Sequence, residues 1–61
     1  MITILVWTKD EPMLPIKYER VDFYHESRKA LEIIQEEAYI TTTTEIMKDS
    51  IIRYQIVEKR A

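Results

Sequence analysis

The fold is decided by two β-branched stretches, YITTTTEI at residues 39–46 and SIIRYQIVE at residues 50–58. Only Met47, Lys48 and Asp49 separate them. Isoleucine, valine, threonine and tyrosine favour extended backbone, because their side chains pack well on a pleated surface. Four consecutive threonines are poor helix formers, since each loses rotamer freedom against the preceding turn. The last third of the chain therefore predicts a strand, a tight turn and a second strand.

In the rest of the chain, the apolar runs predict three more strands. Residues 1–7 (MITILVW) place apolar side chains on both faces of a predicted strand. In the next run, Val21 and Phe23 alternate with Asp22 and Tyr24. A single helical turn before the final strand is a feature of SH3-like five-stranded barrels. The predicted fold class is all-β, a five-stranded antiparallel meander or SH3-like small barrel, with strands at residues 2–8, 17–25, 31–35, 39–45 and 51–58 of a single domain, 1–61.

Residues 26–38 (ESRKALEIIQEEA) leave an alternative open. Their composition is rich in helix formers, and Leu31, Ile34 and Ala38 would form a stripe on one helical face. That reading gives an α+β fold, with a helix at 26–38 packed on a four-stranded sheet. The strand reading instead places a turn at residues 27–30. No glycine or proline follows Ala38 to end a helix, which favours strands.

The short length and the composition of the chain limit the stability that the domain can reach alone. A chain of 61 residues buries only about 60% of its unfolded surface, so it gains from added stabilisation. It has no cysteine for disulfides and a single histidine, which argues against a structural zinc site. We therefore expect a partner subunit, and a homo-oligomer is the simplest form of it. Glycine and asparagine are both absent, so positions with positive φ are costly and two-residue type I′ turns are disfavoured.

The strand pattern resembles that of small uncharacterised β-meander proteins of Gram-positive phages and mobile elements. The resemblance rests on residues 21–26, 30–34, 39–46 and 50–58 (VDFYHE, ALEII, YITTTTEI and SIIRYQIVE). It covers most of the chain at the level of hydrophobic patterning. It implies an uncharacterised accessory protein and assigns no functional residues.

The composition argues against several classes of function. Nine basic and eleven acidic residues give a net charge of −2, which is too balanced to indicate a membrane-surface protein. The absence of glycine excludes the glycine-rich phosphate loops. His25, Glu26 and Ser27 are residue types found in catalytic triads, but neighbours on a strand point to opposite faces. We expect no enzyme activity, cofactor, bound metal or small-molecule substrate.

The residues best suited to meet a protein partner are Trp7, Met13 and Leu14, since exposed aromatics and methionine are enriched at interfaces. In the other reading, Met13 and Leu14 fold back to cover one end of the small core. The predicted function is a protein-interaction module acting by strand-edge pairing and an apolar patch, with the first or last strand as the edge. A structural subunit of a larger assembly is a further alternative.

A second hypothesis is single-stranded nucleic-acid binding on one face of a small barrel. Cations interleaved with aromatic rings hold single strands, because bases stack on the rings while the cations follow the phosphates. The candidate contacts are Lys17, Tyr18, Arg20, Arg53 and Tyr54.

The predicted location is the cytoplasm. MITILVW is too short an apolar run for a membrane span, and it lacks the basic start and the cleavage site of a signal peptide. A chain without cysteine suits a reducing compartment.

Overall fold

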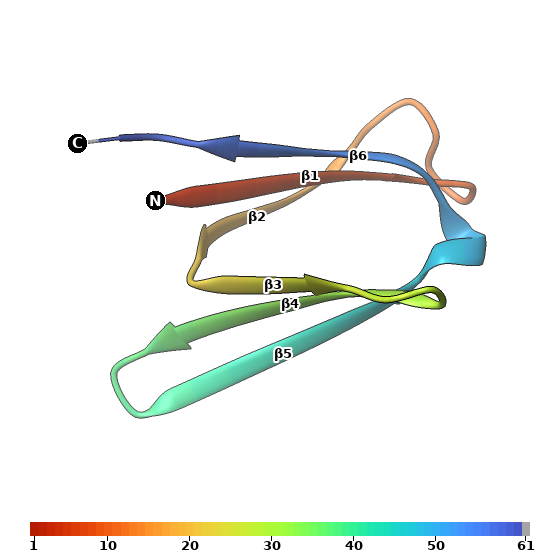
Figure 1. Ribbon diagram of the computed structural model, residues 1–61. Helices are drawn as coiled ribbons and strands as arrows, with labels where there is room; N and C mark the ends of the chain where they lie inside the picture. Colours follow the sequence, from red (N-terminus) through yellow and green to blue (C-terminus); the bar gives the residue numbers. More distant parts are fainter. Residues whose placement is uncertain (61) are drawn as a thin grey trace.

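The computed structural model describes residues 1–60, which form six β-strands in two antiparallel three-stranded sheets (Figure 1). The strands are β1 (Ile2–Thr8), β2 (Ile16–Val21), β3 (Phe23–Glu26), β4 (Ala30–Glu37), β5 (Ile40–Met47) and β6 (Ile51–Glu58), with a 3-10 turn, η1 (Lys48–Ser50), before β6. The strand order is β2-β1-β6 in the first sheet and β3-β4-β5 in the second. The all-β class is confirmed, and so is the single helical turn before the last strand.

The strand expected at residues 31–35 is confirmed, and the alternative helix at 26–38 is wrong, because Leu31 and Ile33 alternate into the core with the period of a strand. Other details of the expected architecture are wrong. The expected strand 17–25 is broken at Asp22, which gives six strands instead of five. The two sheets do not close into a barrel, and β1 lies in the centre of the first sheet, so the first strand is not an edge.

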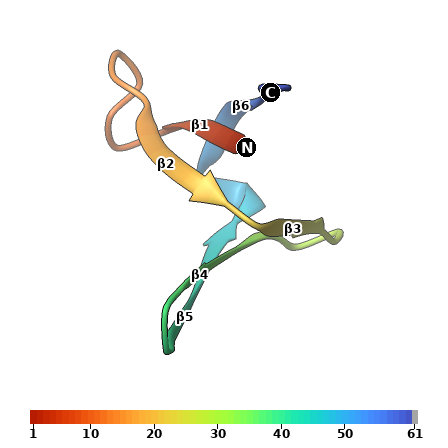
Figure 2. The same cartoon turned by 90° about the vertical axis from the view of Figure 1, so that its left-hand side faces the viewer.

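The chain passes from the first sheet to the second through a bend between β2 and β3. The register of β2 against β1 shifts between the pairs Ile2–Val21 and Ile4–Tyr18, so that two residues of β2 lie opposite one of β1. Arg20, one of these two, has a φ of 54°. A bulge of this kind bends its strand and increases the local twist. It turns the chain toward the second sheet, as the view in Figure 2 shows.

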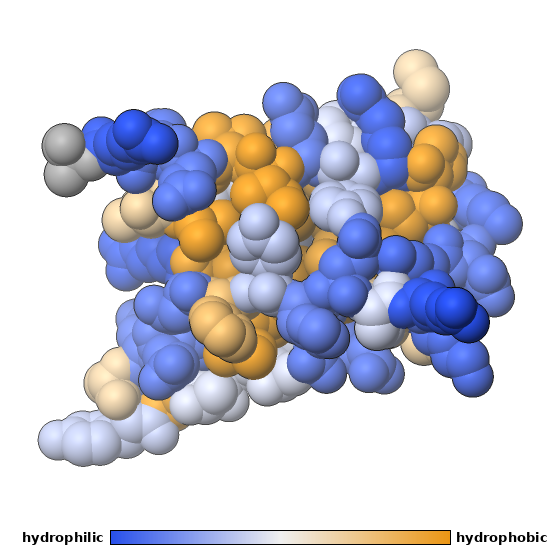
Figure 3. Space-filling view, viewed as in Figure 1, coloured by the Kyte–Doolittle hydropathy of each residue, from blue (hydrophilic) through white to orange (hydrophobic). Residues whose placement is uncertain are grey.

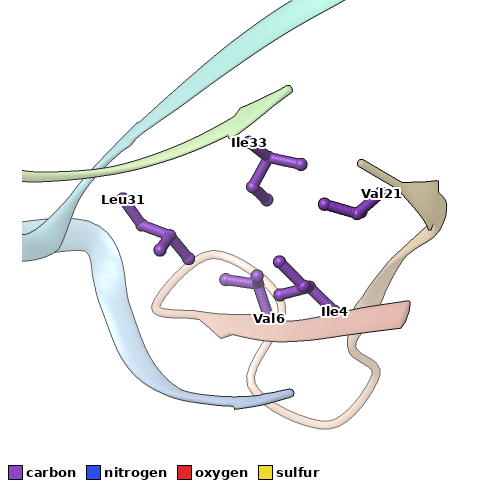
Figure 4. Close-up of a cluster of buried hydrophobic side chains, with 5 residues drawn as sticks. All are labelled: Ile4, Val6, Val21, Leu31 and Ile33. Atoms are coloured by element: carbon purple, nitrogen blue, oxygen red, sulfur yellow. The ribbon is translucent and has the colours of Figure 1, made fainter. Parts of the chain in front are cut away.

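A small apolar core lies between the sheets (Figure 4). Its fully or nearly fully buried members come from β1, β2 and β4: Ile4, Val6, Val21, Leu31 and Ile33. Partly buried side chains surround them, among them Tyr18 of β2, Ile46 of β5 and Ile56 of β6. The core is confined to the middle of the molecule, so the ends of the longer strands extend beyond it.

Backbone hydrogen bonds join the turns to the sheets. Ser27 N donates to Ala30 O at 2.9 Å and closes the β3–β4 hairpin at the turn expected there. Lys48 N donates to Lys29 O at 2.8 Å, and Lys9 N donates to Ser50 O at 2.9 Å, so η1 contacts both sheets. Lys59 N donates to Met1 O at 2.9 Å, which aligns the end of β6 with the start of β1.

The β4–β5 hairpin turns at Ala38 and Tyr39, because Glu37 and Ile40 are its last paired residues. Ala38 has a φ of 51°, a conformation that glycine adopts more readily. The chain thus builds a two-residue hairpin without the residue that such turns favour. Tyr39, the next residue, is fully exposed.

Candidate functional site

The outer face of the first sheet carries the expected interface residue Trp7. On this face Trp7 lies opposite Arg53, and Leu5 lies opposite Lys17 on one side and Gln55 on the other. The Arg53 guanidinium carbon lies 4.0 Å from the centre of the Trp7 ring, a cation–π contact. Trp7 and Leu5 are half-buried, so this face combines moderate apolar surface with two cations.

Met13 and Leu14 lie in the loop between β1 and β2. Their exposed fractions are 83% and 65%, so the reading in which they fold back onto the core is wrong. They occupy a loop, whereas Trp7 lies on β1. The three residues expected to meet a partner therefore come from two different elements.

The five candidate nucleic-acid contacts are divided among several surfaces. Lys17 and Arg53 lie on the outer face of the first sheet, and Lys17 forms a 3.2 Å ion pair with Glu19. Tyr18 and Tyr54 point inward and pack against the core. Burial raises the pKa of the Tyr18 hydroxyl. The strand alternation thus separates the tyrosines from the cations, and within residues 1–60 Trp7 is the one aromatic ring with a cation over its face.

Arg20 lies at a groove of about 680 Å³ between the bulge of β2 and the β4–β5 hairpin. Carboxylates of Glu19, Glu36 and Glu37 accompany it in the lining. Two hydrogen bonds fix the walls: Gln35 Nε2 donates to Glu19 O, and Glu36 N donates to an Asp22 carboxylate oxygen, both at 2.7 Å. The charged groups of its lining are predominantly acidic.

A second hollow of about 400 Å³ lies where β3, η1 and β6 meet. Glu26 on β3 accepts a hydrogen bond from the Tyr54 hydroxyl, and Lys48 Nζ lies 3.5 Å from the same carboxylate. These contacts connect the second sheet to the first. Glu26, Lys48 and Tyr54 are therefore engaged with one another in this hollow.

His25 lies in a row of polar side chains on the outer face of the second sheet. It pairs with Glu32, which in turn lies opposite Glu45. Within residues 1–60, no group of three or more histidine or acidic side chains is arranged to hold a metal ion.

The free edge of β5 is a surface that the sequence reasoning missed. β5 is the last strand in the order of its sheet, so within residues 1–60 one of its edges has no neighbouring strand. Five of its first six residues are exposed. Apolar side chains flank the threonine run, with exposed fractions of 103% for Tyr39, 69% for Ile40 and 49% for Met47. The signal available in the sequence was a long β-branched run with only one charged residue, Glu45.

The space-filling view shows how these surfaces differ (Figure 3). Apolar residues gather in the middle of that face between the two sheets, and charged residues surround them. The β4–β5 hairpin projects beyond the body of the molecule at the lower left (Figure 1), where the surface is mostly pale and lacks the strong blue of charged groups. The outermost part of the hairpin is therefore only weakly hydrophilic on this face, although Glu36 and Glu37 lie exposed beside the turn.

Among the described residues, no helix is long and apolar enough to cross a membrane. The chain matches no protein-family model, no curated protein and no solved structure.

Proposed function

We propose that this chain is a non-enzymatic protein-interaction module that acts by strand-edge pairing and burial of exposed apolar side chains. The observation that carries the proposal is β5, an eight-residue edge strand flanked by exposed Tyr39, Ile40 and Met47. An edge strand of this kind offers a row of unpaired backbone donors and acceptors. Added strands bind such edges through main-chain hydrogen bonds, while side-chain contacts supply specificity.

The small core gives the chain an energetic reason to associate. The fully buried large side chains are Ile4, Val6, Leu31 and Ile33. Burying a side chain of that size stabilises a fold by about 1.5–3 kcal/mol, and ordering each residue costs about as much. The favourable and unfavourable contributions to the free energy of folding are therefore nearly equal. A partner that covers Ile40, Met47 or the outer face of β1 adds further favourable burial.

The finer features of the fold agree with an open relative of the SH3-like barrels. The chain bends between β2 of the first sheet and β3 of the second, and η1 precedes the last strand. Such small domains commonly serve as binding modules, so the resemblance supports interaction over catalysis. The patterning shared with accessory proteins of phages and mobile elements, and the lack of cysteine, suit an accessory role in a reducing cytoplasm.

Sedimentation velocity over a wide range of protein concentration tests the proposal. Self-association predicts a sedimentation coefficient that rises with concentration toward the value of a defined oligomer. The measurement should be repeated with Trp7→Ala, since a fall in association would assign a share of the interface to the outer face of the first sheet. A monomer at every concentration contradicts the homo-oligomer.

Nucleic-acid binding is a second candidate, supported by Arg53 over Trp7 with Lys17 on the same face. A stacking base would compete with Arg53 for the Trp7 ring, which is the chain's only tryptophan. Titration with a single-stranded oligonucleotide at low salt should then quench its fluorescence, and added salt should reverse the effect. Unchanged fluorescence and gel mobility at low salt contradict this function.

A further inference from the structure

The side chains of β5 are arranged symmetrically about Thr43. Equal steps in both directions from Thr43 reach two threonines, then Thr41 and Glu45. The next steps reach two isoleucines, Ile40 and Ile46, and finally Tyr39 and Met47. Apart from one threonine–glutamate pair, each position therefore has a counterpart of similar polarity. This symmetry is what a two-fold interface requires, because the same surface must fit itself.

The backbone of β5 shows which residues face the free edge. Lys48 N donates to Lys29 O, so residue 48 is turned toward the chain of β4. In an antiparallel pair, the N–H and C=O of alternate residues point to the same side. The even-numbered residues of β5 are therefore bonded to β4. The backbone groups of Thr41, Thr43, Glu45 and Met47 point away from it.

The other edges of the two sheets carry features that oppose pairing. The edge strand β2 has a bulge at which Arg20 has a positive φ. The register of β6 against β1 shifts between Trp7 and Thr8, and β3 has only four residues. In contrast, β5 pairs with β4 through eight consecutive residues without a shift, and it carries no lysine, arginine or proline. Bulges, short strands and lysines protect edges from pairing, and β5 lacks all three.

We propose that β5 pairs antiparallel with β5 of a second copy of this chain, about a two-fold axis at Thr43. The pairing joins the two second sheets into one continuous six-stranded sheet. This inference rests on the proposed function and names the partner and the register of its edge contact. In this register Thr43 faces its own copy, Thr41 faces Glu45, and Ile40 faces Ile46.

Side-chain chemistry selects this register over its neighbours. A shift that keeps the same faces together moves the axis to Thr42 or Thr44. With the axis at Thr44, Ile46 would face Thr42 and Ile40 would face Lys48. With the axis at Thr42, Ile40 would face Thr44 and Tyr39 would face Glu45. Only the axis at Thr43 matches isoleucine with isoleucine on the face that continues from the core.

The same register also suits the backbone and the charges. The pairs Thr43–Thr43 and the two Thr41–Glu45 pairs each exchange two main-chain hydrogen bonds, about six in all. No like charges face each other across the new contact. Lys48 of one copy comes opposite Ala38 of the other, beside the hairpin tip that carries Glu36 and Glu37.

Two lysine substitutions on the same strand and the same exposed face test the proposal. Thr43→Lys places two positive charges opposite each other at the axis. It should raise the dimer dissociation constant about fivefold, since like charges directly opposite destabilise a strand pair. Thr41→Lys places a lysine opposite Glu45 of the partner and should leave the dissociation constant unchanged or lower it. Sedimentation velocity reads both variants, and circular dichroism verifies that each keeps its β-sheet spectrum.

Cross-linking gives an independent measurement of the register. The chain has no cysteine, so Thr43→Cys and Thr41→Cys each contain a single thiol. The two Cα atoms at position 43 would lie about 5.5 Å apart, within disulfide range. Those at position 41 would lie roughly 14 Å apart, four residues along the strand. Mild oxidation should therefore yield a disulfide-linked dimer from Thr43→Cys and little from Thr41→Cys.

The outcomes separate this inference from the proposed function. A dimer in sedimentation that is insensitive to Thr43→Lys, or equal cross-linking at both positions, overturns the pairing at β5 and leaves self-association standing. Equal loss of the dimer in both lysine variants overturns the register. A monomer at every concentration overturns self-association itself, and the pairing with it.

Discussion

At the scale of single residues, the chain stands out for positive φ values at residues other than glycine. Arg20 has a φ of 54° and Ala38 a φ of 51°. The left-handed conformation costs a non-glycine residue about 1–2 kcal/mol, because Cβ approaches the following carbonyl oxygen. Each is held by its surroundings, Arg20 by the bulge against β1 and Ala38 by the Glu37–Ile40 pair. A sequence without glycine or asparagine gave no indication of either site.

Ala38→Gly should stabilise the fold. It removes the steric cost of the positive φ, and the greater freedom of glycine in the unfolded chain offsets part of that gain. The net change expected in the free energy of unfolding is about +0.5 to +1 kcal/mol. Urea denaturation at one fixed protein concentration measures it.

The control is the same substitution at Ala30, a buried residue of β4 without a positive φ. Ala30→Gly should lower the free energy of unfolding by about 0.5–1 kcal/mol, because glycine in a strand interior loses more entropy on folding. A destabilising effect of Ala38→Gly would contradict the strain attributed to that turn.

At the scale of the elements, the junction of β3, η1 and β6 depends on one carboxylate. Glu26 accepts the hydrogen bond of the Tyr54 hydroxyl, and Lys48 lies against the same group. On the opposite side of the molecule Gln35 donates to Glu19 O and connects β4 to β2. Because the sheets do not close into a barrel, such contacts together with the core hold them in place.

Tyr54→Phe should therefore weaken the attachment between the sheets. It removes the hydroxyl that donates to Glu26 and keeps the ring that packs on the core. The expected loss is about 0.5–1.5 kcal/mol in the free energy of unfolding, the usual net contribution of a hydrogen bond.

Tyr24→Phe serves as the matched control for this measurement. Tyr24 lies on β3, and within residues 1–60 its hydroxyl donates no hydrogen bond. Thermal unfolding should show little change for Tyr24→Phe and a lower Tm for Tyr54→Phe. Equal effects of the two substitutions would show that the Tyr54 hydroxyl does not hold the sheets together.

At the scale of the whole molecule, stability depends on a core of few residues. Ile33 is fully buried between the sheets, whereas Ile52 on β6 is 53% exposed. Removing a buried methylene costs its transfer free energy and leaves a cavity that the small core fills only in part. Each core side chain therefore carries a large share of the total stability.

Ile33→Val should lower the free energy of unfolding by about 0.5–1.5 kcal/mol. The same substitution at the exposed position, Ile52→Val, should change it by less than about 0.5 kcal/mol. Chemical denaturation of the two variants beside the parent chain provides the comparison. Similar losses at both positions would mean that Ile52 is covered by a partner in solution, which would move the interface toward β6.

Local patterns along the chain were enough to locate most of the strands, although not the break at Asp22. The β-branched runs at residues 39–46 and 50–58 and the alternation of Ile4 and Val6 are local signals, since a strand buries every second side chain whatever its partner. The turn at residues 27–30 and the helical turn before β6 were found in the same way. Residues 26–38 were the one ambiguous segment, because Glu, Gln, Leu and Ala also favour helix.

The pairing of the strands, in contrast, could be seen only in the folded chain. The positions of β1 at the centre of its sheet and of β5 at a free edge follow from contacts between residues far apart in the chain, such as Ile4 with Ile56. The bend at Arg20 and the positive φ of Ala38 are likewise imposed by strand pairs close to them in the chain. The pairs Tyr18–Ile4 and Val21–Ile2 flank Arg20, and the pair Glu37–Ile40 closes the turn at Ala38. Local preferences act between near neighbours, whereas sheet order and free edges depend on non-local contacts that no single segment encodes.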